Sequence, residues 1–518
     1  QASAQDRISP PLSSGAAAAP LPVPSAAPAP SDLTAAPPTA PASAAIAPPS
    51  APGPETTSPA QRATPASAGG PGDSNPSAAG TGGLRIESPA LGTPVPPKSI
   101  EARATPAAEG GPGDPAAAAA GPGGFRVIAL NRSSEIRLRA LVQGDGRMWF
   151  DDAQRPQVNT FLIRRAQPWA EGRLPYGVTF ILIPDFGGGT VVLQDAYLGI
   201  ELNEALKFRF GKFRPPFGLE RLQPSSNLSF VEFGLPTLLT PNRDVGAMVY
   251  GDLLSRVVGY AAGIFNGVPD NASSDLASDN PKEFDGRVYL RPFELIPHHA
   301  LGRLFVGVTT TFTRVYGTPA APLLPVYKTP GQATIFSYTA AAAATANYAN
   351  TAVANGPHNR YGAYLYEAVG PLGLLGEYYE SDQEVGSAGK GNLQVHNRAY
   401  QAQATLLFFG ADASYDYVHV RTPVDLEAGG FGALELALRA GRLDLDSASF
   451  SRFASTSSSV RGATELAAGL NWYWSDNAKL VFDYDNTQFN GGASTPTEVS
   501  AGHREAENIF LLRAQVVY

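Results

Sequence analysis

The feature that most constrains this chain is an alternation of apolar and polar residues with a period of two. It is clearest in EIRLRALVQGDGRMWF, residues 135–150. Because successive side chains of a β-strand point to opposite sides, this spacing predicts a strand with one apolar and one polar face. The apolar face would hold Ile136, Leu138, Ala140 and Val142, and the polar face Arg137, Arg139, Gln143, Asp145 and Arg147.

The same division recurs further along the chain, between turns rich in Gly, Asp, Asn and Pro. In EALKFRF, residues 204–210, Leu206, Phe208 and Phe210 oppose Lys207 and Arg209. ELAAGLNWYW, residues 465–474, and the closing NIFLLRAQVVY repeat the pattern. A soluble β-sandwich alternates as well, so the pattern alone favours a transmembrane barrel by only a small margin.

Aromatic residues give further support for a transmembrane barrel over a soluble sandwich. Trp149, Trp472 and Trp474 stand where a predicted strand meets a short polar turn, as expected for the aromatic girdle of a membrane barrel. Ordinary hairpin-end aromatics are the alternative. The terminal Tyr518 on an alternating last strand resembles the signal by which outer-membrane barrels are recognised for insertion.

The length of this region sets the size of the barrel. Residues 134–518 can supply sixteen antiparallel strands of about ten residues with their connections. Long loops are expected near residues 266–284 and 337–356. No run of about 18 apolar residues is present, which argues against a transmembrane helix. An even number of strands would place both ends of the barrel in the periplasm.

Residues 1–124 have a different composition, dominated by Ala, Pro, Gly and Ser. With so few large apolar side chains, this segment is predicted to be a disordered tether. Residues 125–518 are predicted to form the barrel. The start at Gln1 suggests an exported, processed protein. An imperfect duplication, beginning at Arg62 and again at Arg103, fits low-complexity expansion. The alternative is a short element that docks on the barrel mouth or the cell wall.

Several function classes are disfavoured. A net charge of −8 argues against nucleic-acid binding, and the absence of cysteine excludes thiol-based metal or redox sites. We find no motif typical of a hydrolase, a nucleotide-binding enzyme or a zinc protease. Asp483 and Asp485 share a strand face and would suit Ca²⁺ or acid–base chemistry, but solvated acids of a lumen wall are the better interpretation. We therefore expect no enzyme activity, metal or cofactor.

The chain resembles the phosphate-selective porins O and P. The resemblance rests on GKFRPPFGLER, the later PNRD and FNG segments, FLIRRAQPWAEGRL, FDGRVYLRPFE and the closing strand, in family order across residues 125–518. It implies a sixteen-stranded outer-membrane barrel, usually a homotrimer in outer-membrane lipid. It also implies that inorganic anions, phosphate above all, pass a constriction narrowed by an inward-folded third loop.

The resemblance further implies a constriction site. The matching positions are Arg164, Arg165, Asp195, Arg221 and Ser225, with Ser226 as a second candidate for the serine. Two departures stand out: Arg221 occupies a position where Lys is expected, and Glu232-Phe233 replaces Glu-Arg. Arg and Lys differ in their capacity for bidentate contacts, so tight phosphate selection is placed in question.

The strand pattern predicts a row of cationic side chains along the lumen, which we call the ladder. Its members are Arg137, Arg139, Arg147, Lys207 and Arg209. Partly hydrated, weak sites let an anion both enter and leave. The alternative is that these side chains pair with Asp145, Asp195 or Glu201 and only solvate the wall. Asp195 would either hold arginines in place, the favoured interpretation, or accept a proton from dihydrogen phosphate.

The sequence thus predicts a porin for passive diffusion of small anions in a bacterial outer membrane, with its N-terminal tether in the periplasm. One alternative is an envelope scaffold whose tether binds peptidoglycan or periplasmic proteins. Another is the barrel sheath of a multiprotein conduit.

Overall fold

A computed structural model describes residues 117–121, 124–128, 134–150, 157–296, 299–340 and 351–518. The chain divides into two units, residues 1–79 and 80–518, and all described residues belong to the second. Most of the predicted tether, with the first copy of the duplication, lies outside the described residues.

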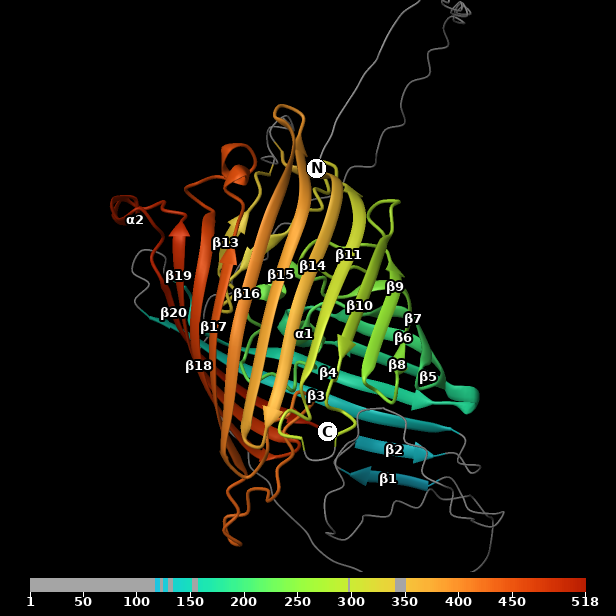
Figure 1. Cartoon of the computed structure of the whole chain (residues 1–518). Coiled ribbons are helices and arrows are strands. Elements are labelled where there is room, and N and C mark those ends of the chain that lie inside the picture. Colours follow the sequence, from blue (N-terminus) through green and yellow to red (C-terminus); the bar gives the residue numbers. More distant parts are fainter. Residues whose placement is uncertain (1–116, 122–123, 129–133, 151–156, 297–298, 341–350) are drawn as a thin grey trace, which may run out of the picture. The chain divides into compact units, whose positions relative to one another are not determined.

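The described part of this unit consists mainly of β-strands (Figure 1). The first ten are β1 (Ala117–Gly121), β2 (Gly124–Ile128), β3 (Glu135–Phe150), β4 (Thr160–Arg173), β5 (Val178–Asp185), β6 (Val192–Asn203), β7 (Leu206–Phe213), β8 (Asp244–Leu253), β9 (Val258–Phe265) and β10 (Glu283–Leu290). The others are β11 (Phe305–Tyr316), β12 (Val326–Lys328), β13 (Thr334–Ser337), β14 (Val353–Val369), β15 (Leu372–Ser387), β16 (Gly391–Phe409), β17 (Ala433–Asp444), β18 (Val460–Ser475), β19 (Ala478–Gly491) and β20 (Glu507–Val517).

Helical segments are short and lie in the connections. They are α1 (Leu219–Leu222), α2 (Pro496–Ala501) and the 3-10 turns η1 (Pro175–Gly177), η2 (Gly187–Gly189), η3 (Leu235–Leu239) and η5 (Ser447–Ser451). None of the helices in the described ranges has the length and apolar character needed to cross a membrane.

The strands close into a sixteen-stranded antiparallel barrel, as predicted. Each strand from β3 to β11 and from β14 to β20 pairs with its neighbours, and β20 returns to pair with β3. The seam runs from Asn508 opposite Phe150 to Val517 opposite Leu141. Closure leaves these sixteen strands without a free edge, which a bilayer requires because its core offers no water to unpaired backbone groups.

A hairpin of β1 and β2 extends the barrel beyond this seam. Phe125 lies opposite Leu138 and Ile128 opposite Glu135, so β2 occupies the part of β3 that β20 does not reach. Regular pairing therefore begins at Ala117, earlier than the predicted boundary at residue 124.

The predicted alternation holds along the strands. Leu138 and Val142 are 47% and 48% exposed on the outer surface, whereas Gln143 and Asp145 are buried inside. Leu466 and Phe510 are likewise exposed outside, and Glu465 and Arg513 are buried inside. The outward apolar band suits lipid contact, and the polar side chains gather in the lumen.

Trp149 is an exception to the predicted aromatic girdle. Its side chain packs against a buried cluster of Val231, Val481, Ile509 and Leu511 inside the barrel. The physical reason is parity, because position 149 shares the inward face of β3 with positions 145 and 147. Trp472 and Trp474 face outward, with ring centroids 5.3 Å apart.

The wall of the barrel is uneven in height. We call the end at which β3 begins and β20 ends the terminal end, and the opposite end the distal end. β5, β7, β9 and β10 have 8 residues each, whereas β14, β15 and β16 have 17, 16 and 19. The green strands of Figure 1 thus form a low wall, and the orange strands a high wall.

The third distal connection, residues 214–243 between β7 and β8, folds into the lumen as predicted; we call it the constriction loop. It follows Phe213 directly, where Pro215 and Pro216 cannot donate to a sheet ladder. Its backbone binds side chains from the far wall: Leu219 N donates to Glu377 Oε1 at 2.7 Å, and Asn471 Nδ2 donates to Ser229 O at 2.8 Å. The loop therefore crosses the barrel interior.

Candidate functional site: an arginine-lined passage beside the constriction loop

A polar cavity of about 240 Å³ lies on the distal side of the constriction loop; we call it the distal cavity. Cations dominate its lining, which includes a single carboxylate, Glu232, among the described residues. The cations are Arg164, Arg165, Arg214, Arg221, Arg243 and Lys328.

Arg164 and Arg165 both reach this cavity although they are adjacent in β4. Gly144 pairs with Ile163 and Gln143 with Arg165, so Arg164 is the extra residue of a β-bulge. A bulge re-aims a side chain that the regular strand would send to the opposite face. Two neighbouring arginines can therefore enter one lumen.

Part of the charge in the distal cavity is neutralised. Glu232 accepts from Arg147 Nη2 at 2.8 Å and from Arg164 Nε at 2.7 Å. Asp195 pairs with Arg243 at 3.1 Å. These carboxylates position guanidinium groups and offset their charge.

Arg221 is held without a carboxylate. Its Nε donates to Thr240 Oγ1 at 2.9 Å, and its Nη2 donates to Thr237 O and Asn271 Oδ1, both at 2.6 Å. Its guanidinium carbon lies 4.8 Å from the centroid of the Phe233 ring. Phe233, which replaces the arginine expected from the family, thus supplies the face on which Arg221 rests.

Arg214 stands beside Arg221 in the same loop. Its Nη1 donates to the carbonyl oxygens of Arg221 and Gln223. Burial, and next the charge of Arg243, lower the pKa of Arg214 to about 9 and that of Arg221 to about 10. Both groups remain protonated at neutral pH, and an anion in the cavity would offset part of the cost that burial and the charge of Arg243 impose on them.

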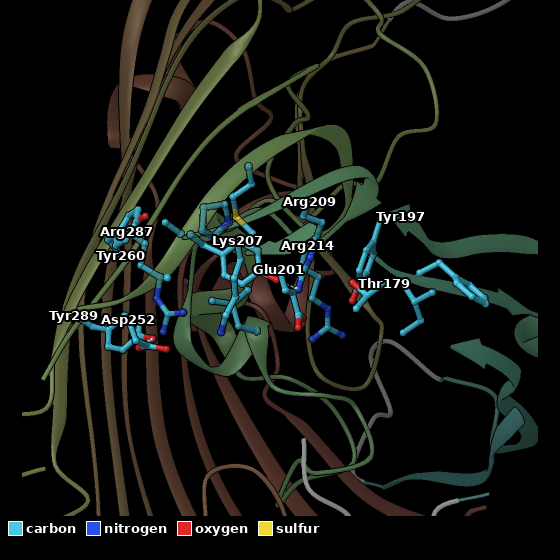
Figure 2. A pocket seen from close by; sticks show the side chains of 18 of the residues that line it. Thr179, Tyr197, Glu201, Lys207, Arg209, Arg214, Asp252, Tyr260, Arg287 and Tyr289 are labelled. Atoms are coloured by element: carbon cyan, nitrogen blue, oxygen red, sulfur yellow. Dashed lines mark hydrogen bonds between the residues drawn. The ribbon is translucent and has the colours of Figure 1, made fainter. Parts of the chain in front are cut away.

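A second cavity, of about 290 Å³, lies on the terminal side of the loop, and Arg214 lines both; we call it the central cavity. Figure 2 shows Lys207, Arg209 and Arg214 on one side of it and Arg287 with Tyr289 on the other. Phe180, Tyr197, Tyr250 and Tyr260 complete its aromatic lining.

Tyrosine rings hold the arginines of the central cavity. The guanidinium of Arg209 lies 4.3 Å from the Tyr197 ring centroid and 5.0 Å from that of Tyr250. Arg287 lies 4.8 Å from the Tyr289 centroid and donates to the Tyr364 hydroxyl. A ring fixes a cation through its quadrupole but leaves the net charge in place.

The acids of the central cavity are occupied by other arginines. Asp252 pairs with Arg291 at 3.1 Å, Glu201 with Arg173 at 2.7 Å and Glu171 with Arg139 at 3.8 Å. In the described part of the chain, no ion pair forms to the four arginines that follow one another through the passage. We call these four the arginine line: Arg221, Arg214, Arg209 and Arg287.

A wider vestibule of about 950 Å³ continues the passage towards the terminal end. It shares Arg209 and Arg287 with the central cavity. Connections at that end contribute the other charged residues of its lining, including Arg256, Arg291, Arg303, Asp412 and Arg421. The three cavities therefore succeed one another from the distal end towards the terminal end, past the constriction loop.

The predicted constriction residues are only partly brought together. Arg164, Arg165 and Arg221 line the distal cavity, and Asp195 pairs with Arg243 of that lining. Ser225 and Ser226 instead use their carbonyl oxygens to accept from Gln143 and Gln515, so they bind the loop to the wall. The roles assigned to all of these residues stay predictions.

The predicted ladder is also divided. Lys207 and Arg209 line the central cavity. Arg137 pairs with Glu135, Arg139 lies 4.7 Å from the Trp169 ring centroid as well as near Glu171, and Arg147 pairs with Glu232. The expected partners Asp145 and Glu201 bind Arg513 and Arg173 instead.

Sequence reasoning missed Arg214, Arg243 and Arg287. Arg287 has a usable signal, since it alternates with the outward Phe284 and Val288 of β10 with the phase that points inward. Arg214 follows the last residue of β7 and precedes the double proline. Its direction depends on how the loop turns, which the local pattern does not encode.

The expectation that Asp483 and Asp485 are solvated acids of the lumen wall is wrong. Both are buried, at 2% and 1% exposure, beneath the constriction loop, and Asp483 accepts from Val231 N. They are therefore not the solvated acids of an open wall. Elsewhere in the described ranges, Glu380, Asp382 and His396 have ligand atoms close enough to share a metal ion, but they lie on strand faces turned away from the lumen.

The chain is similar to several solved structures. The chain is similar to the outer membrane channel DcaP of Acinetobacter baumannii, with 11% identity, a TM-score of 0.48 and coverage of 74% of this chain and 98% of that one. The corresponding values for OmpT of Vibrio cholerae are 12%, 0.47, 74% and 98%. For an anion-selective porin from Comamonas acidovorans they are 10%, 0.45, 74% and 100%.

No curated protein sequence matches the chain. The family comparison is decisive for the barrel: the sequence model of the phosphate-selective porin O and P family matches residues 136–518, so the chain belongs to this family of outer-membrane porins.

Proposed function

We propose that this porin is anion-selective and that phosphate is its preferred small inorganic anion. The observation that carries the proposal is the arginine line, whose four guanidinium groups have no carboxylate partner in the described residues. The distal cavity, the central cavity and the vestibule connect these groups in sequence.

The physical basis of anion passage is that the ion exchanges its hydration water for fixed hydrogen-bond donors of the protein. An anion that enters a narrow lumen loses part of its hydration shell and must meet hydrogen-bond donors at each step. Guanidinium groups supply forked, permanently charged donors. Because the four arginines are distributed over successive cavities, an anion can pass from one to the next without being trapped in a single deep site.

Phosphate is favoured over chloride by geometry. Its oxygens match the bidentate donors of arginine, and Arg221 offers such donors where the family is expected to carry a lysine. Several N–H groups of Arg221 already donate to Thr237, Thr240 and Asn271. We therefore place Arg221 in an anion site shared with Arg214 and Arg243 rather than in a site of its own.

We further propose that the chain assembles as a homotrimer through the low wall. An eight-residue strand is about 26 Å long and, at the tilt of about 35–45° usual in outer-membrane barrels, spans only about 20 Å, less than their apolar band of about 25 Å. Leu198, Phe210 and Phe284 are exposed on this wall. Partner subunits would cover a surface that lipid alone matches poorly.

The terminal end would then face the periplasm, with residues 1–116 extending from it. The scaffold and conduit alternatives stay predictions. Deleting residues 1–116 separates the scaffold from the porin proposal: conductance should be unchanged, whereas a scaffold would lose its envelope partner. The conduit alternative needs a lumen filled by another protein, which would co-purify with the barrel.

The test of anion selectivity is the reversal potential of the full chain in planar bilayers across a KCl gradient. The sign expected for chloride carrying most of the current supports the proposal, and a preference for potassium would refute it. Titration of phosphate into a chloride solution tests the narrower claim. A saturable block of the chloride current is expected, and block by sulfate at equal concentration would remove the preference for phosphate.

A further inference from the structure

We propose that Tyr415 is a positioning residue for the constriction loop and that it acts from a turn at the terminal end of the barrel. The proposal rests on the proposed anion passage. The turn comprises residues 410–432 and connects β16 to β17. Its counterparts after β14 and β18 are only residues 370–371 and 476–477, so this connection is long for its end of the barrel.

The turn folds inward and is anchored there. Val418 and Val420 are buried in one apolar cluster with Leu219 of α1. Arg303 Nη1 donates to Ala413 O at 2.7 Å, and Val420 N donates to Asp476 Oδ1 at 2.7 Å. The first part of the turn is therefore fixed on both sides of Tyr415.

Two hydrogen bonds join the turn to the constriction loop. The Tyr415 hydroxyl donates to Leu219 O at 2.8 Å, and Gln223 Nε2 donates to Tyr415 O at 2.7 Å. The Tyr415 ring meets Phe305 and Tyr366 edge-on, with centroid distances of 5.3 and 5.4 Å. Removal of the hydroxyl alone would keep this ring packing and lose the bond to α1.

The bonded segment of the loop is the one that carries two members of the arginine line, Arg214 and Arg221. Leu219 opens α1 and Arg221 belongs to it, and the carbonyl oxygens of Arg221 and Gln223 receive Arg214. Gly218, with a φ of 84°, makes the bend before α1 in a conformation that favours glycine. A helix of four residues gains little order by itself, so its placement depends on outside contacts.

Strand β15 of the barrel wall supplies the other contact that fixes the position of α1. Leu219 N donates to Glu377 Oε1 and to the Tyr379 hydroxyl, both at 2.7 Å. Tyr415 binds the carbonyl oxygen of the same residue. Leu219 is thus held at its N–H by β15 and at its C=O by the turn, and loss of either contact would widen the range of positions open to Arg214 and Arg221.

The test is Tyr415→Phe in the full chain, with Tyr417→Phe as its matched control. Tyr417 lies in the same turn, and its hydroxyl has no hydrogen bond to the constriction loop in the described residues. We expect Tyr415→Phe to weaken phosphate block of the chloride current by about two- to tenfold, the effect of one lost hydrogen bond. Single-channel current noise should rise, and the thermal unfolding temperature of the barrel should be unchanged.

Equal phosphate block and equal noise in the two variants would overturn the proposal. Gln223→Leu removes the second bond of the pair and should reproduce the increase in noise, so the proposal does not rest on one variant. If the wild-type channel prefers cations, the anion function fails by that measurement alone. A difference in current noise between Tyr415→Phe and Tyr417→Phe would still report positioning of the loop.

Discussion

The two edges of the constriction loop differ in how their polar groups are satisfied. Along residues 225–232 the loop is bonded to β3 and β17–β20: Lys479 Nζ donates to Leu228 O at 2.7 Å and Gln515 Nε2 to Ser226 O at 2.9 Å. We call this the sealed edge. The open edge faces β4–β10, where the cavities lie and the arginines of the line have no acid partner.

The difference separates stability from transport. On the sealed edge, every lost partner leaves a buried polar group unpaired, so substitutions there should act on folding. On the open edge, the cations rest on rings and carbonyl groups and keep donors for a passing anion. Substitutions there should act on selectivity and leave the barrel intact.

The largest effect is expected for Arg513→Ala. Arg513 is 1% exposed and forms two hydrogen bonds of 2.7 Å with Asp145 across the closing seam of β20 and β3. Its loss leaves Asp145 buried without a counter-charge, at a cost of about 3–5 kcal/mol. Thermal unfolding of the purified barrel, followed by circular dichroism, should shift to lower temperature.

A matched variant makes this prediction specific. Arg513→Leu combined with Asp145→Leu removes both charges and should recover most of the lost stability, since no unpaired ion remains. If Arg513→Ala unfolds at the wild-type temperature, the ion pair does not secure the seam.

The next effect concerns the open edge. Arg214→Ala removes the cation that lines both the distal and the central cavity. A unit charge about 10 Å from an ion, at an effective dielectric constant of about 20, stabilises an anion and destabilises a cation by about 1.7 kcal/mol each, so the anion-to-cation permeability ratio should fall by at least about an order of magnitude. The reversal potential across a KCl gradient measures this ratio.

The unfolding temperature of Arg214→Ala serves as the internal control and should stay near that of the wild type, because no carboxylate is left unpaired. A large loss of stability with unchanged selectivity would place Arg214 with the residues of the sealed edge and break the distinction between the two edges.

The contrast also explains what the sequence could and could not predict. Alternation is local, so the faces of Leu138, Gln143 and Arg513 followed from spacing alone. The inward turn of the constriction loop came from the family resemblance and from the double proline. One of the rings that hold Arg209 belongs to Tyr250, which becomes adjacent only after β7 pairs with β8.

The burial of Asp483 could not be predicted from the sequence, because it also depends on segments that are distant in the chain. Nothing near Asp483 in the sequence indicates that Val231, distant in the chain, donates its N–H to that carboxylate. Adjacent arginines in β4 would face opposite sides in a regular strand, and only the register shift at Gly144 brings both inward. Local patterns thus determined the wall, whereas the passage depends on contacts between distant segments.

A smaller effect is expected at Phe233, which supports Arg221 and lies 5.8 Å from the guanidinium of Arg214. Phe233→Ala removes the ring but no charge. A cation–π contact contributes about 0.5–2 kcal/mol, so phosphate block should weaken by about two- to thirtyfold while the reversal potential in KCl changes little. Phe233→Tyr keeps the ring and should behave like the wild type, and equal block by both variants would exclude support by the ring.

The smallest effect should come from an ion pair outside both edges. Arg442 and Asp444 form a 2.8 Å pair on the outward side of β17, with side chains 41% and 29% exposed. Because water screens such a pair, Arg442→Gln should cost at most about 1 kcal/mol and leave conductance and selectivity unchanged. The thermal unfolding temperature and the reversal potential of Arg442→Gln, compared with those of Arg513→Ala and Arg214→Ala, test this expectation. A shift in selectivity as large as that of Arg214→Ala would mean that total charge, rather than placement on the open edge, controls which ions pass.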